Sequence, residues 1–304
     1  METANNKKFT VTVGIPAHNE EANIKNLLES ILSQKRDNFE LEQVIIISDG
    51  SADSTEKRVS EINSDKIRLI ADGKRLGKPT RINQIFSEAN SDIVVIFDAD
   101  IKLEGDSVLD SLIKPFLNDS EIMLVSGKSE PLAPVNFVQK VVYTGIKIWD
   151  EVKEKSGSMM YFCEGPIRAF KKPLYKEIKF PSTSADDVYP YLFSLKKGYK
   201  FYYAEKALAC HKLPSTYADY VRQTRRYLDS ENIHEKNFGG DFIKKHYTVS
   251  LFLKLKVLIK YLFVSPFWTL AYLSFVARPK IASIFSSQKG INESSLWEIV
   301  KSTK

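Results

Sequence analysis

Cysteine is scarce in this chain of 304 residues, which contains only Cys163 and Cys210. Two cysteines without zinc-type spacing predict neither a structural zinc site nor a disulfide framework. We therefore expect both thiols to be reduced, as in a protein of the cytosol. The N-terminal residues 1–8 are polar and lack the apolar stretch of a signal peptide.

Signatures of several other protein classes are also missing. The chain has no arginine-rich arm and no recognised nucleic-acid-binding motif, so we expect no nucleic acid partner. It lacks the Walker A pattern of P-loop ATPases. We find no internal repeat, no low-complexity tract and no proline- or glycine-rich linker within residues 1–240. That span is therefore predicted to be one domain, followed by a C-terminal segment, residues 241–304.

The net charge of +6 reflects 44 basic and 38 acidic residues, and the basic excess is unevenly distributed. Lysines gather late in the chain, next to apolar sequence, at Lys236, Lys244, Lys245, Lys254, Lys256 and Lys260. Such a cluster favours a membrane surface over nucleic acid as the partner.

Apolar patterns predict strands that alternate with helices over residues 9–117. The predicted strands are Phe9–Pro16, Gln43–Ser48, Lys66–Ala71 and Ile93–Phe97, and the predicted helices are Glu20–Gln34, Gly77–Ala89 and Ser107–Phe116. This alternation with short connections indicates a parallel sheet with right-handed crossovers. Later elements are less regular: strands at Ile122–Val125, Tyr161–Phe170 and Tyr199–Leu208, and helices at Asn136–Lys155, Asp187–Lys197 and Ser215–Glu235.

The stretch Asp92–Asp100 organises the chain, because a buried strand ends there in Asp98 and Asp100. The carboxyl ends of strands are where open α/β sheets bind ligands. Residues two apart on a strand point the same way, so both carboxylates face one point, where a hard divalent cation would neutralise them. The alternative is a solvated loop that happens to contain two acids.

Other loops follow predicted strands. After the second strand, Asp49 has the acceptor oxygens that a base or ribose needs, and Gly50 allows backbone to approach a ligand. The alternatives are a plain turn there and helix capping for Asn19 and Glu20. The basic glycine loop Asp72–Lys78 precedes a helix, an arrangement that suits phosphate binding. The alternative is a solvated basic turn without a ligand.

Two later segments carry candidate chemistry. Asp186 and Asp187 precede a predicted helix. One of them is a candidate general base, and the alternative is that they cap the helix. Gln223, Arg226 and Tyr227 share one face of a predicted helix, where arginine can bind phosphate with two hydrogen bonds. The alternative for that helix is a solvated charged face.

Taken in this order, these motifs resemble those of the family 2 glycosyltransferases. The residues that carry the resemblance are Pro16–Glu21, Asp49–Asp53 with Thr55, Gly77 and Lys78 with Asn83, Asp98–Asp100, Asp186 and Asp187, and Gln223–Tyr227. The resemblance implies a GT-A fold, which is a Rossmann-like α/β architecture with a mostly parallel central sheet. It also implies inverting transfer of a sugar from a nucleotide diphosphate sugar, with a UDP-sugar as the expected donor and Mn²⁺ or Mg²⁺ as the cofactor.

Roles follow from the resemblance position by position. The donor and its nucleotide are expected at Pro16, Asn19, Glu20, Asp49, Lys78, Asp98, Gln223, Arg226 and Tyr227. The metal is expected at Asp100 and Asp98, with His211 where some relatives have a third ligand. Asp187 takes the place of the general base, although the family's Glu-Asp pair reads Asp186-Asp187 here and leaves the assignment open. Tyr227 replaces the tryptophan of the processive synthases' Q-x-x-R-W motif, and the several long membrane spans of those enzymes are absent.

The C-terminal segment contains 17 consecutive uncharged residues, Tyr261–Ala277, with Pro266 among them. A spanning helix, a re-entrant or interfacial helix, and a core helix of the domain are all compatible with this run. We expect this segment to hold the enzyme at the cytoplasmic face of the membrane, close to a polysaccharide or lipid-linked acceptor.

Two protein classes other than glycosyltransferases are alternatives. A nucleotidyltransferase on a similar sheet usually carries a glycine-rich signature with Arg or Lys near its first strand, which Gly14–Asn19 does not supply. A non-catalytic nucleotide-sugar-binding protein would be expected to lack at least one acid, whereas Asp98, Asp100 and Asp187 are all present.

Overall fold

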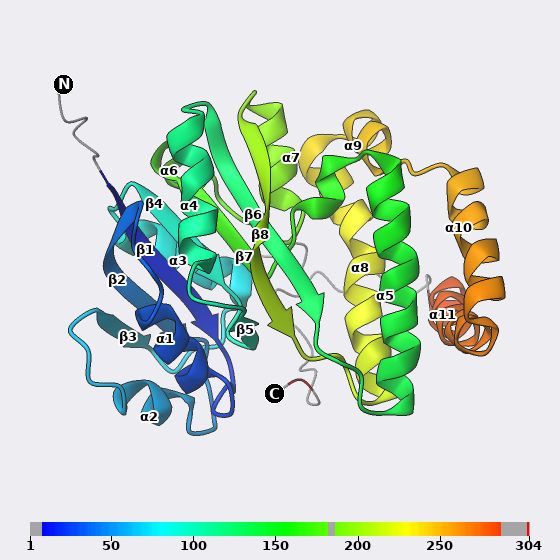
Figure 1. Cartoon of the computed structure of the whole chain (residues 1–304), viewed down its shortest axis with the longest axis horizontal. Coiled ribbons are helices and arrows are strands. Elements are labelled where there is room, and N and C mark those ends of the chain that lie inside the picture. The colour runs from blue at the N-terminus through cyan, green and yellow to red at the C-terminus, as the bar shows by residue number, and fades with distance from the viewer. Residues whose placement is uncertain (1–7, 182–185, 287–302, 304) are drawn as a thin grey trace. The chain divides into compact units, whose positions relative to one another are not determined.

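The computed structural model describes residues 8–181, 186–286 and 303. Its strands form one eight-stranded sheet in the order β3-β2-β1-β4-β7-β6-β8-β5 (Figure 1). Four strands pair in parallel, as predicted: β1 (Phe9–Ala17), β2 (Phe39–Ser48), β3 (Ile67–Ala71) and β4 (Ile93–Phe97). The parallel arrangement brings the loops after β1, β2 and β4 to one edge of the sheet.

The remaining strands are β5 (Ile101–Leu103), β6 (Ile122–Pro131), β7 (Ile167–Lys171) and β8 (Lys200–His211). Strand β7 is antiparallel to both β4 and β6, an orientation that the sequence did not reveal. The prediction of extended chain over Tyr161–Phe170 was wrong at its start, where a 3₁₀ helix covers Met159–Phe162. Proline has no N–H for a strand ladder, and β7 begins directly after Pro166.

Helices connect these strands. They are α1 (Ile24–Leu32), α2 (Thr55–Ser60), α3 (Lys78–Glu88), α4 (Val108–Asn118), α5 (Phe137–Ser156), α6 (Lys172–Glu177), α7 (Tyr189–Lys196), α8 (Tyr217–Phe238) and α9 (Gly240–Tyr247). Helix α1 starts later than predicted because Asn19 has a left-handed φ of 54° and the amide of Glu20 donates to Thr55 Oγ1.

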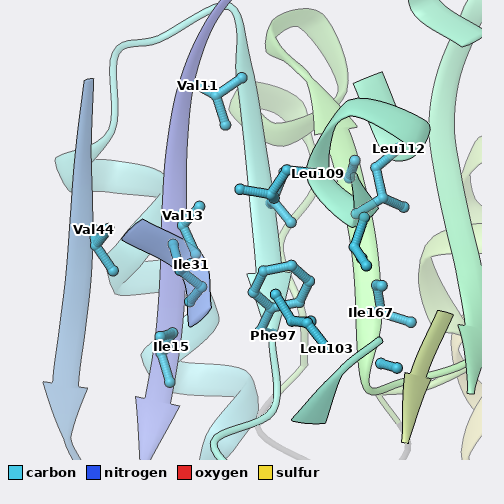
Figure 2. Packing of buried hydrophobic residues seen from close by; sticks show 14 of the residues in the cluster. Val11, Val13, Ile15, Ile31, Val44, Phe97, Leu103, Leu109, Leu112 and Ile167 are labelled. Carbon is cyan, nitrogen blue, oxygen red and sulfur yellow. The ribbon is translucent and has the colours of Figure 1, made fainter. Parts of the chain in front are cut away.

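The core of the sheet consists of fully buried aliphatic side chains. Every residue of β4 is 0% exposed, as expected for a parallel strand covered on both faces. Figure 2 shows Val13 and Ile15 of β1, Phe97 of β4 and Leu109 of α4, which belong to one buried cluster. This packing holds the end of β4, and with it Asp98, in a fixed position.

The chain divides into two compact units. The first comprises Met1–Glu130, Cys163–Ser182 and Asp186–Cys210, and the second comprises Pro131–Phe162, Thr183–Ala185 and His211–Lys304. The boundary predicted at residue 240 stays a prediction. Cys163 and Cys210 both belong to the first unit and are both free thiols.

The apolar run Tyr261–Ala277 is divided between two helices, α10 (Leu251–Val264) and α11 (Pro266–Ser286) (Figure 1). Ser265 separates them, and Pro266 begins α11, where its missing N–H leaves no helical bond unmade. Within the described ranges, no helix combines the length and the hydrophobicity needed to cross a membrane.

Candidate active site

Lys78 joins two of the predicted motifs in the first unit. As the first residue of α3, it places its ammonium 2.7 Å from Oδ1 of Asp98 and 3.1 Å from Oδ2 of Asp186. Burial alone would lower the pKa of Lys78, but the neighbouring carboxylates of Asp186 and Asp98 raise it above its ordinary value. The ammonium therefore stays charged and links the end of β4 to the Asp186–Asp187 segment.

Asp98 and Asp100 lie in the turn between β4 and β5. Burial raises the pKa of Asp98, and the charge of Asp100 raises it further, while Lys78 opposes both effects. A second cation here would therefore favour the charged form of both carboxylates. Hard carboxylate oxygens suit Mg²⁺ or Mn²⁺, so these two residues fit the predicted metal as a partial ligand set. Among the described residues, no group of three or more His, Cys, Asp or Glu side chains is arranged to hold a metal ion.

Buried Arg168, in β7, fixes the Asp186–Asp187 segment. Its Nη1 donates to the carbonyl oxygens of Asp186, at 2.7 Å, and Asp187, at 3.2 Å, and its Nη2 donates to Oδ2 of Asp186 at 3.2 Å. Both Arg168 and Asp186 are almost completely buried. The carboxylate of Asp186 pairs with both Lys78 and Arg168, and these ion pairs hold the segment in place.

The two neighbouring carboxylates have opposite pKa shifts. For Asp186, burial acts to raise the pKa, but the charges of Lys78 and Arg168 outweigh it and lower the value. For Asp187, burial and the charge of Asp186 raise the pKa to about 6. Helix α7 begins after Val188 without a side-chain cap, so the capping alternative for these aspartates is wrong. Asp187 thus has the proton affinity of a general base near neutral pH.

Asp49, directly after β2, is enclosed by the loop that precedes α3. Its carboxylate accepts hydrogen bonds from the amides of Leu76, at 2.7 Å, and Gly77, at 3.0 Å, and from Nε of Arg81 at 2.8 Å. Arg81 is completely buried and also forms two hydrogen bonds with Asp72. Asp49 therefore shapes the basic glycine loop, and its direct contact with a base stays a prediction.

The loops after β1 and β2 are bonded to each other. Oδ1 of Asn19 accepts from the amide of Ala52 at 2.8 Å, and the amide of Asn19 donates to Oγ of Ser51 at 3.1 Å. Glu20 is 3% exposed, and its Oε2 accepts from Nδ2 of Asn23 at 2.8 Å just before α1. Pro16 is buried within β1. These bonds join the two loops, and the contact of Pro16, Asn19 and Glu20 with a nucleotide stays a prediction.

The remaining predicted residues belong to the second unit. His211 ends β8, and burial lowers its pKa, which favours the neutral imidazole that a metal requires. Gln223 lies within α8. Arg226 and Tyr227 fall in the same helix, but their side chains are outside the described part of the chain. The roles of these four residues stay predictions.

Sequence reasoning missed Arg81, Arg168 and Gly165. A Cβ on Gly165 would lie 1.9 Å from Oδ1 of Asp187, so only glycine leaves room for that carboxylate. Arg168 interrupts the apolar residues of β7, and a charge inside an apolar strand was the one available signal. Arg81 lies in α3 among other polar residues such as Asn83 and Gln84, and nothing local in the sequence marks it as buried.

The family model described as Glycosyl transferase family 2 matches residues 12–178, more than half of the chain. The chain is 34% identical over 125 residues to the probable glycosyltransferase YdaM of Bacillus subtilis (strain 168), covering 39% of this chain and 29% of that protein. It is 24% identical over 226 residues to the poly-beta-1,6-N-acetyl-D-glucosamine synthase of Staphylococcus aureus (strain COL), covering 71% and 53%. The chain thus spans about half the length of these relatives, or less.

Solved structures share the architecture. The mannosyltransferase PcManGT from Pyrobaculum calidifontis, in complex with GDP-Man and Mn²⁺, has a TM-score of 0.59 and 20% identity, over 94% of this chain and 77% of that chain. Glucosyl-3-phosphoglycerate synthase from Mycobacterium tuberculosis, in complex with Mn²⁺, UDP and glucosyl-3-phosphoglycerate, has a TM-score of 0.53 and 16% identity, over 76% and 80%. The predicted α/β fold of the GT-A type, with a mostly parallel sheet, is confirmed.

Proposed function

Because this chain belongs to glycosyl transferase family 2 and is therefore a glycosyltransferase, we propose that it is an inverting enzyme that uses a UDP-sugar. The proposed acceptor is a growing polysaccharide or a lipid-linked saccharide. The observation that supports this most is the meeting of three predicted motifs in one unit, where Lys78 bridges Asp98 and Asp186 beside Asp187.

The proposed general base is Asp187. A base must be charged at the working pH yet hold a proton well enough to remove it from a hydroxyl, and a pKa of about 6 meets both conditions. Asp186 is the weaker candidate, since its pKa is lowered and its carboxylate is bonded to Lys78 and Arg168. Removal of the acceptor proton as the hydroxyl attacks the anomeric carbon is a single displacement, which inverts configuration.

We expect Gly165→Ala to lower kcat with little change in the KM for the donor. The added methyl group would lie 1.9 Å from Oδ1 of Asp187, so the carboxylate must move. A misplacement of about 1 Å can lower a rate roughly 10²-fold. Gly240→Ala is the matched control, because a Cβ there meets no atom within 4 Å. Steady-state kinetics decide it, and an unchanged kcat for Gly165→Ala would be inconsistent with Asp187 as the base.

The proposed cofactor is Mn²⁺ or Mg²⁺, held by Asp98 and Asp100. Such an ion would neutralise charge on the departing diphosphate. Two of the solved structures described above contain Mn²⁺, which supports this choice of ion.

We expect Mn²⁺ to strengthen UDP binding in the wild type and to have little effect in Asp100→Ala. Loss of a metal ligand should reduce the metal-dependent part of the affinity at least about tenfold, since even outer-shell partners matter that much. Calorimetric titration of UDP with and without Mn²⁺ measures this directly. Asp106→Ala is a control at an exposed aspartate that pairs with Lys35. Equal enhancement by Mn²⁺ in wild type and Asp100→Ala would remove Asp100 from the ligand set.

The donor and acceptor are supported by different observations. UDP is present in the complex of the mycobacterial synthase, and the staphylococcal relative is named for a polymer of N-acetylglucosamine. Location at the cytoplasmic face of the membrane is proposed from the lysine-rich C-terminal segment. A panel of UDP-, GDP- and dTDP-sugars with Mn²⁺, scored for nucleotide release, tests the donor. Release of GDP or dTDP without release of UDP would overturn the proposed donor class.

A further inference from the structure

Helix α10 of the second unit exposes an unusual amount of apolar surface. Five side chains define what we call the α10 face: Leu251 is 69% exposed, Phe252 76%, Leu255 47%, Ile259 53% and Phe263 85%. With about 100° between successive residues of a helix, these five fall within one sector of roughly a third of its circumference. Contiguous exposed apolar surface of this kind marks an interaction site.

The opposite side of α10 is already occupied. Val257 is 1% exposed and packs in a buried cluster with Ile148 and Val152 of α5. Tyr261 donates its hydroxyl hydrogen to the carbonyl oxygen of Lys147, also in α5. Because the opposite side of α10 packs on α5, the α10 face stays exposed on this unit and does not belong to its core.

Lysines flank the α10 face on both sides. Viewed down the helix axis, Lys254 lies on one side of the apolar sector, and Lys256 and Lys260 lie on the other. Helix α10 contains no acidic residue. Lys260 is paired with Glu151 at 2.7 Å, and Lys254 and Lys256 are exposed. An apolar face bordered by exposed lysines is the pattern of a helix that lies in the plane of a membrane with anionic headgroups.

We propose that the α10 face binds an anionic phospholipid surface, with its apolar side chains among the acyl chains and Lys254 and Lys256 on the headgroup phosphates. This deepens the proposed function, on which it rests for a membrane-borne acceptor, and it assigns the contact to the α10 face, which shares only Phe263 with the run Tyr261–Ala277. A second copy of the chain fits less well. A two-fold interface would place two α10 faces against each other, each bordered by lysines and without an acidic residue of α10, and like charges repel.

Sedimentation of the full chain with vesicles tests the proposal. We expect binding to vesicles of equimolar phosphatidylcholine and phosphatidylglycerol, and weak binding to phosphatidylcholine alone. Phe252→Gln and Phe263→Gln should each reduce the partition coefficient about tenfold, because each removes a side chain that would be buried in lipid. Lys254→Gln and Lys256→Gln should each reduce it about fivefold, and only with the anionic vesicles.

The matched control is Leu117→Gln, at a leucine of α4 that is 45% exposed, similar to Leu255. Release of UDP from a UDP-sugar without vesicles should be the same in all these variants, so a failure of lipid binding is distinguishable from a failure of the proposed activity. Two results would overturn the proposal: wild-type chain that stays in the supernatant with anionic vesicles, or Phe263→Gln that sediments like wild type. Concentration-dependent dimers in light scattering that Phe263→Gln abolishes would assign the α10 face to a second copy instead.

Discussion

Asp187→Asn is expected to lower kcat about 10²- to 10⁴-fold while UDP binding stays close to wild type. The amide keeps the size of the side chain but cannot accept the acceptor's proton. Burial and the charge of Asp186 raise the pKa of Asp187 to about 6, so in the wild type kcat should rise with pH through that value as the carboxyl loses its proton. The small residual rate of the variant should lack this step. Steady-state kinetics across pH, with calorimetry of UDP, measure both effects.

Asp186→Asn is the informative comparison. This change removes the charge that pairs with Lys78 and Arg168, so its main effects should be on stability and on the placement of Asp187. A different outcome is easy to recognise. Near-normal turnover by Asp187→Asn, together with an inactive but folded Asp186→Asn, would move the base to Asp186.

Arg168→Leu should lower the free energy of unfolding by about 3–5 kcal/mol. The guanidinium is completely buried and bonds the carboxylate of Asp186 together with two backbone carbonyl oxygens. Without it, Lys78 is the one cationic partner that the described part of the chain leaves at the buried carboxylate of Asp186. We also expect a lower kcat, because the segment that carries Asp187 loses its anchor. Urea unfolding of the full chain, followed by fluorescence, measures the change in stability.

Arg58→Leu is the control for this experiment. Arg58 pairs with Glu61 on the surface of the same unit and is 46% exposed, so its loss should change the free energy of unfolding by less than about 1 kcal/mol. If Arg168→Leu unfolds at the same urea concentration as Arg58→Leu, the buried network does not stabilise the site as we describe.

The parallel half of the sheet could be predicted because its physical cause is local. Strand β4 is buried on both faces and therefore reads as an unbroken apolar run, and the intervening helices show their own apolar period. The direction of β7 could not be predicted in this way. Its five residues have the same alternation in either orientation, and only pairing with β4 and β6 decides it.

The candidate site shows the same division. Asp98, Asp100 and Asp187 could be proposed from the sequence because each follows or precedes a recognisable element. Arg81 and Arg168 could not, since arginine usually marks a solvated surface and only the folded chain buries these two beside aspartates. At the C-terminus, the sequence emphasised the uncharged run, whereas the packing of α10 on α5 also leaves apolar side chains exposed before that run, at Leu251, Phe252, Leu255 and Ile259.

The stereochemistry of the reaction tests the central claim most directly. In the absence of acceptor, excess enzyme should slowly transfer the sugar to water, and proton NMR can identify the anomer that forms first, before it equilibrates in solution. The donor for this measurement is the α-linked UDP-sugar that releases the most UDP in the panel. We expect the β anomer to appear first, because Asp187 directs a single displacement. Initial formation of the α anomer would mean retention of configuration and would contradict the mechanism proposed for this site.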